Sequence, residues 1–130
     1  MMIIHLGTND LDVDTQMGVH HRARDAMAWC RNAIPYTAIV FLLLLPRRFN
    51  SNYTDQTMAA RVRRKFNTSF RKLAHSNAFR TISHPHIDPN DPYLFFWDGL
   101  HLANEGYNVM LDTFASAVRF FFNDHSAFAF

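Results

Sequence analysis

Two short motifs in this 130-residue sequence combine residue types that serve acyl-transfer chemistry. In Gly7-Thr8-Asn9-Asp10, the glycine permits a tight turn, and the amide of Asn9 is a donor that can stabilise an oxyanion. In Asp98-Gly99-Leu100-His101, the spacing lets the carboxylate accept the Nδ1–H bond of the imidazole. That bond fixes the tautomer and leaves Nε2 facing outward as a general base. The sequence therefore predicts an oxyanion donor and an oriented base.

Each motif also has an ordinary structural explanation when it is taken alone. The carboxylates of Asp10, Asp12 and Asp14 can cap turns or the next helix. Asp98 can equally be a helix-capping residue beside a surface histidine. Trp97 is predicted either to line an acyl or leaving-group pocket or to pack against its own loop. The position of the motifs in the fold decides between these interpretations.

The hydrophobic pattern predicts three strands. Met2–Leu6 is a short apolar segment that ends at Gly7. Thr37–Leu45 is a nearly unbroken apolar run, which is typical of a strand buried on both faces of a parallel sheet. Phe79–Ser83 is a third, shorter strand.

Helices are predicted between and after these strands. Apolar residues recur at helical spacing over Thr15–Ala33, over residues 55–77 and over Glu105–Asn123. Asn104 is the expected N-cap of the last helix. Residues 84–103, which contain three of the five prolines, are predicted to form a long loop, and such loops are often functional.

Strands that alternate with helices indicate right-handed βαβ units and a parallel sheet covered on both faces. Residues 1–130 are accordingly expected to form a single domain. In such sheets, functional residues collect in the loops at the carboxyl ends of the strands. Both motifs follow strands at that edge, so we expect them to lie close together.

Together and at these positions, the two motifs resemble the third and fifth sequence blocks of the SGNH (GDSL-type) hydrolase superfamily. Residues 98–107 look like the usual start of the last helix of that family, and residues 44–48 are similar to its stretch between the two blocks. The resemblance implies a three-layer, flavodoxin-like α/β fold. This chain would hold the C-terminal part of it, with about three parallel strands and helices on both faces.

The resemblance also implies roles for individual residues. Asp98 and His101 would be catalytic, and Asn9 would lie in the oxyanion hole. Substrate contacts are expected at Gly7, Thr8 and Trp97. The implied substrates are carboxylic esters, acyl or acetyl, and the implied chemistry needs no cofactor.

The nucleophile of that family is missing from the sequence. None of the four glycines begins a Gly-Asp-Ser block, which would be expected upstream of Met1. We therefore predict an incomplete domain, from a truncated gene, a split gene or a degenerate copy, that is inactive alone. The family's first strand is expected to be absent as well. Met2–Leu6 would then be an exposed edge through which the chain associates with itself.

Charge suggests an alternative function. Residues 47–80 contain nine Lys or Arg against Asp55 alone, a net charge of +8. A non-catalytic module that associates with nucleic acid would use eight of these nine basic side chains. The eight are Arg47, Arg48, Arg61, Arg63, Arg64, Lys65, Arg71 and Lys72. We favour the simpler interpretation that they form a solvated helix face.

Composition and motifs argue against several other classes of protein. Aromatic residues make up 15% of the chain, which excludes a disordered protein, and Cys30 is the only cysteine, which excludes an internal disulfide. His84-Pro85-His86 lacks the four regularly spaced ligands of a structural metal site. The longest apolar run has eight residues, against the ~18–20 that span a bilayer, and no signal peptide is evident. We therefore expect a cytoplasmic protein without metal or membrane contact.

Overall fold

The computed structural model describes residues 1–5, 16–49 and 54–130. Three strands alternate with helices, and a short 3-10 helix and a long helix follow. The elements are β1 (Met2–Ile4), α2 (Gln16–Ala33), β2 (Ile39–Leu42), α3 (Gln56–Ser76), β3 (Arg80–Ile82), η1 (Pro92–Leu94) and α4 (Asn104–Asn123). The predicted alternation is confirmed. The strands are shorter than the apolar runs, and the expected residues Leu6 and Thr15 lie outside the described part.

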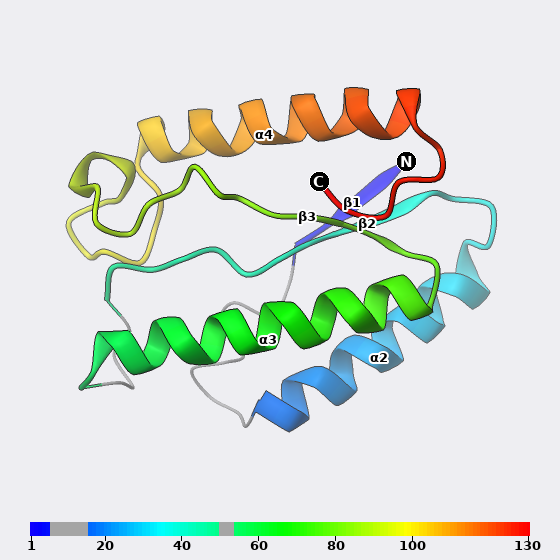
Figure 1. The fold of residues 1–130 in the computed structure, drawn as a ribbon, viewed down its shortest axis with the longest axis horizontal. Helices are drawn as coiled ribbons and strands as arrows, with labels where there is room; N and C mark the ends of the chain where they lie inside the picture. Colours follow the sequence, from blue (N-terminus) through cyan, green and yellow to red (C-terminus); the bar gives the residue numbers. More distant parts are fainter. Residues whose placement is uncertain (6–15, 50–53) are drawn as a thin grey trace.

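The strands form one parallel sheet in the order β1-β2-β3. Its register aligns Ile3 with Val40, and Phe41 with Thr81. Helices α2 and α3 cover one face of the sheet and α4 covers the other, so the sheet is the middle of three layers (Figure 1). This is the α/β arrangement that the motifs imply.

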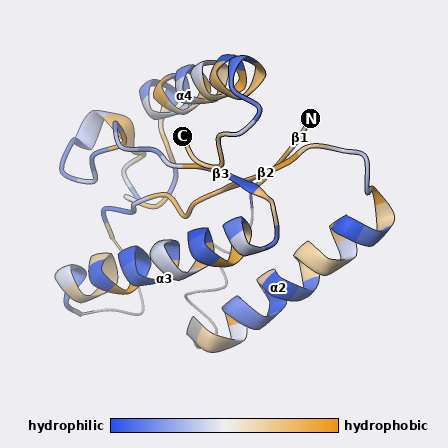
Figure 2. Cartoon of the chain, turned by 45° about the vertical axis from the view of Figure 1, so that its right-hand side comes forward, coloured by the Kyte–Doolittle hydropathy of each residue, from blue (hydrophilic) through white to orange (hydrophobic). Residues whose placement is uncertain are grey.

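Strand β2 lies at the centre because its side chains are apolar toward both faces. Val40 and Leu42 pack with residues of β3 and α4. Ile39 and Phe41 pack with residues of α2 and α3 instead. Figure 2 shows hydrophobic strands at the centre, whereas hydrophilic residues recur along α2 and α3. The predicted burial of this strand on both faces is confirmed.

The ladder of β2 ends early because a helix side chain takes over its backbone hydrogen bonds. The N–H of Leu43 still donates to Ile82 O over 2.9 Å. Leu44 instead donates to Asn67 Oδ1 at 2.9 Å and accepts from Asn67 Nδ2 at 3.0 Å. Asn67 of α3 thus makes the two bonds that a neighbouring strand would make. For this reason β2 ends at Leu42, whereas the sequence predicted a strand that extends to Leu45.

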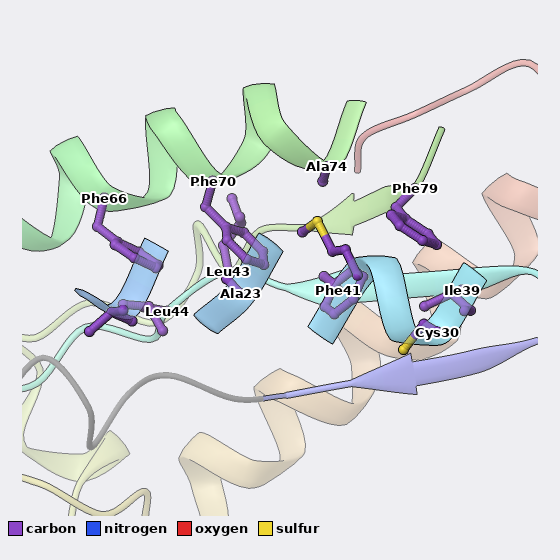
Figure 3. Packing of buried hydrophobic residues seen from close by; sticks show 12 residues of the cluster. Ala23, Cys30, Ile39, Phe41, Leu43, Leu44, Phe66, Phe70, Ala74 and Phe79 are labelled. Carbon is purple, nitrogen blue, oxygen red and sulfur yellow. The ribbon is translucent and has the colours of Figure 1, made fainter. Parts of the chain in front are cut away.

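The larger core fills the space between the sheet and the α2–α3 layer (Figure 3). The ring of Phe41 meets Phe70 and Phe79 edge to face, with centroid separations of 5.7 and 5.5 Å. From α2, Met27 and Cys30 close the same cluster. Cys30 is a free cysteine that is buried in this core, where its side chain packs as a small apolar group.

The two edges of the sheet differ. Residues 128–130 run parallel to the outer side of β3, where Thr81 N donates to Phe128 O at 2.9 Å and Phe130 N donates to Thr81 O at 3.0 Å. Within the described part of the chain, β1 pairs only with β2. The expected association of chains through β1 stays a prediction.

Helix α4 begins one residue earlier than expected. Its N-cap is Ala103, whose side chain makes no capping hydrogen bond, and Asn104 is the first helical residue. The N–H of Ala103 donates to Leu94 O at 3.0 Å, just after a bridge between Phe95 and Leu102. These backbone contacts set the start of the helix, so the prediction that Asn104 caps it is wrong.

Candidate active site

The loop between β3 and α4 folds back on itself and presents residues 98–101 at its tip. Phe95 and Leu102 form an antiparallel bridge across the base of this turn. Beside the bridge, Phe96 N donates to His101 O at 2.9 Å. Within the long loop that the prolines predicted, residues 95–102 thus form a hairpin, which holds the aspartate and the histidine on one short turn.

Gly99 anchors this turn to the segment that leaves β2. Its φ of 65° lies in the left-handed region, where a side chain is unfavourable. Its carbonyl accepts hydrogen bonds from Arg48 N at 2.8 Å and Phe49 N at 3.4 Å. A Cβ at this position would lie 2.3 Å from the Phe49 ring. Glycine is therefore required here for both its backbone angle and its close contact.

Asp98 and His101 are in direct contact. Asp98 Oδ2 lies 2.6 Å from His101 Nδ1, and its Oδ1 accepts from the backbone N–H groups of Leu100 at 2.8 Å and His101 at 3.0 Å. The bond with the imidazole, followed by the two backbone bonds, lowers the pKa of Asp98 to about 2. The three-residue spacing in the sequence thus brings the two side chains together.

The contact sets the roles of the two imidazole nitrogens. Asp98 is ionised at neutral pH and can only accept, so Nδ1 of His101 carries the proton. In the neutral ring, Nε2 is then an acceptor. The His101 side chain is 71% exposed, whereas that of Asp98 is 25% exposed. This orientation is the one that a general base needs.

Of the other predicted site residues, only Trp97 lies within the described part of the chain. Gly7, Thr8 and Asn9 lie outside the described residues. Because β1 is parallel to β2, the chain leaves Ile4 toward the carboxyl edge of the sheet. The side chain of Trp97 is 94% exposed, so the interpretation that it packs against its loop is wrong. A substrate contact at Trp97 stays a prediction.

Sequence reasoning considered His84 only as a metal ligand and missed its position in the fold. Its ring lies edge-on to Phe114, with centroids 5.5 Å apart, and neither ring nitrogen has a hydrogen-bond partner among the described residues. Burial and, to a lesser extent, the charge of His5 lower the pKa of His84 to about 4. His84 is therefore neutral at pH 7. The effect of His5 also places the residue after β1 near the loop that follows β3.

No serine of the described part hydrogen-bonds to His101. Four of these serines use their hydroxyl groups elsewhere, in bonds of 2.6–3.0 Å to nearby acceptors. They are Ser69 (to Phe66 O), Ser76 (to Leu73 O), Ser83 (to Phe130 O) and Ser126 (to Asp124 Oδ1). The described residues therefore contain the acid–base pair without a nucleophile hydrogen-bonded to it.

Residues 1–5, 16–49 and 54–130 contain no group of three or more His, Cys, Asp or Glu side chains that could hold a metal ion. None of the helices in these ranges combines the length and the apolar character needed to cross a bilayer.

Among solved structures, the chain is similar to the esterase domain of the ORF1 protein from the zebrafish ZfL2-1 retrotransposon. The likeness has a TM-score of 0.67 at 21% sequence identity, and it covers 88% of this chain and 70% of that chain. This chain shares the fold of an esterase domain. No protein-family model matches the sequence, and no curated protein matches it. The esterase-like fold implied by the motifs is thus confirmed, while the catalytic roles of Asp98 and His101 stay predictions.

Proposed function

We propose that this chain is an esterase-like domain that provides the general base of an SGNH-type hydrolase and does not hydrolyse esters by itself. The observation that carries the proposal is the 2.6 Å contact of Asp98 Oδ2 with His101 Nδ1, which leaves Nε2 of an exposed imidazole free to accept a proton. The fold shared with an esterase domain supports the same chemistry. Carboxylic esters, acyl or acetyl, are the proposed substrate class.

In the proposed reaction the nucleophile is a serine of a Gly-Asp-Ser block, which these 130 residues do not contain. As the serine oxygen attacks the ester carbonyl, His101 Nε2 takes its proton and Asp98 stabilises the imidazolium. The amide of Asn9 donates to the oxyanion of the tetrahedral intermediate. His101 then returns the proton to the leaving alcohol. Water attacks the acyl-serine with the help of the same base, which releases the acid and restores the serine.

Without the serine nucleophile, His101 has no hydroxyl group from which to take a proton. Acyl transfer needs a nucleophile within hydrogen-bond reach of the base, because the free hydroxyl is a weak nucleophile at neutral pH. The serines at positions 69, 76, 83 and 126 donate their hydroxyl groups to other acceptors. For this reason the domain is proposed to hold the base in position without turning over substrate.

Hydrolysis of p-nitrophenyl acetate at neutral pH tests the proposal. We expect the purified chain to release p-nitrophenol no faster than the His101→Ala variant does. His86→Ala serves as the matched control, because His86 is also an exposed histidine and lies outside the Asp98–His101 pair. Turnover that is lost in His101→Ala and kept in His86→Ala would show that the chain is an active esterase, and would contradict the proposal.

A further inference from the structure

A groove with a volume of ≈ 530 Å³ lies between α3 and the loop that follows β3. One wall is formed by α3, and the other by residues 83–85 and 87–89. Leu43, Leu44 and Pro46 line it between these walls. Neither Asp98 nor His101 lines this space, so the groove is distinct from the candidate active site.

The α3 wall is strongly basic. Arg63, Arg64 and Arg71 line it, and within the described part of the chain no carboxylate lies within ion-pair distance of any of the three. The one acidic lining residue is Asp88, whose Oδ1 already accepts two bonds from Asn90. The groove therefore has three guanidinium groups against one carboxylate.

The position of Arg63 makes this excess of positive charge energetically unfavourable. Its Nη1 donates to Leu44 O at 3.3 Å, which holds the guanidinium partly buried. Burial, followed by the repulsion of Arg64, lowers the pKa of Arg63, although arginine stays protonated. An oxyanion between the two side chains would offset both effects, because it supplies the missing opposite charge.

The remaining polar groups of the wall are largely engaged within the protein. Asn67 uses its amide on both backbone groups of Leu44, and Thr68 Oγ1 donates to Arg64 O. The free donors of α3 in the groove are therefore guanidinium groups, which bind phosphate oxygens in a bidentate manner. Arg64 and Arg71 are about 10 Å apart along the helix axis. That separation suits a ligand with more than one charged group.

We propose that this groove binds a ligand with two or more phosphate groups through Arg63, Arg64 and Arg71. The ligand is either a free polyphosphate-bearing small molecule or the phosphodiester backbone of a single nucleic-acid strand. Both share the chemistry that the groove recognises. This site is independent of the proposed ester hydrolysis.

A comparison of two double variants separates this groove from a merely basic helix. Arg64→Gln/Arg71→Gln removes two positive charges that line the groove. Lys65→Gln/Lys72→Gln removes two from exposed positions of the same helix that do not line it. All four side chains are exposed, so both variants should fold, and circular dichroism verifies this. The net charge of the two variants is the same.

The probes are inorganic tripolyphosphate, measured by calorimetry, and a fluorescent oligothymidylate, measured by polarisation at several salt concentrations. We expect the groove variant to bind about tenfold or more weakly, and the control variant to keep the affinity of the natural chain within about twofold. For the oligothymidylate, the slope of log K against log salt should become shallower by about 0.7 for each phosphate that the variant no longer neutralises.

If only the groove variant binds a probe more weakly, the result supports the proposal, whichever probe it is. The probe that binds identifies the source of the phosphates. Binding of tripolyphosphate alone indicates a free small molecule, whereas binding of the oligothymidylate indicates a strand. The absence of binding of both probes, or an equal weakening in the two variants, would overturn the proposal. The arginines would then be an ordinary solvated face of α3.

Discussion

Replacing Phe41 with alanine should lower the free energy of unfolding by about 3–5 kcal/mol. The Phe41 side chain is 1% exposed and packs edge to face against Phe70 and Phe79. Its removal leaves a cavity between β2 and the α2–α3 layer, where the surrounding side chains can relax only partly. Domains of this size are stable by about 5–15 kcal/mol, so the change is a large fraction of the total. Urea denaturation followed by circular dichroism measures it.

Phe122→Ala is the matched control for this prediction. The same side chain is removed, but Phe122 of α4 is 64% exposed. The expected change in the free energy of unfolding is within about 0.5 kcal/mol. Equal destabilisation in the two variants, or a change below about 1 kcal/mol for Phe41→Ala, would contradict the central position of Phe41 in the core.

The carboxyl group of Asp98 should titrate at about pH 2 in the natural chain, well below its ordinary value of 3.8. The bond with His101 is the largest cause, so His101→Ala should raise the pKa of Asp98 toward 3.8. Because the pKa is lower in the folded state, the pair stabilises the fold above pH 3.8. This stabilisation is lost as the pH falls through about 2. Carboxyl ¹³C NMR shifts measured against pH give both midpoints.

Asp124 provides an internal reference in the same spectra. Its pKa is lowered by hydrogen bonds from Ser126, and the residue lies at the far end of α4 from His101. His101→Ala should therefore leave the Asp124 midpoint unchanged while it moves that of Asp98. An Asp98 carboxyl that titrates near 3.8 in the natural chain, or that does not respond to His101→Ala, would show that the pair is not formed in solution.

The parts of the fold that depend on local pattern could be predicted from the sequence. An unbroken apolar run predicts β2, because a strand that is buried on both faces carries apolar side chains on both of them. The spacing of Phe66 and Phe70 predicts α3, since residues four apart share one helix face. The contact of Asp98 with His101 is predicted for a similar reason: three residues of spacing across a turn bring the two side chains together.

Features that depend on tertiary contacts could not be predicted in this way. The pairing of Ala129 with Thr81 joins segments far apart in the chain, and the tail shows no strand pattern of its own. The early end of β2 results from the hydrogen bonds of Asn67 with Leu44. In the sequence, Asn67 is noticeable only because asparagine is a weak helix former and this one lies in the middle of a helix. Asn104 has the residue type of a cap, but the bond of Ala103 to Leu94 sets the helix start one position earlier.

The proposed active site requires Asn9 to lie beside His101 at the carboxyl edge of the sheet. A nitroxide spin label on Asn9→Cys, with Cys30 replaced by alanine, broadens the NMR signals of nuclei close to it. We expect strong broadening of the ring signals of His101. No broadening is expected at His75, which lies in the last turn of α3 at the opposite edge of the sheet. Sharp His101 signals, or stronger broadening at His75, would contradict the convergence of the two motifs.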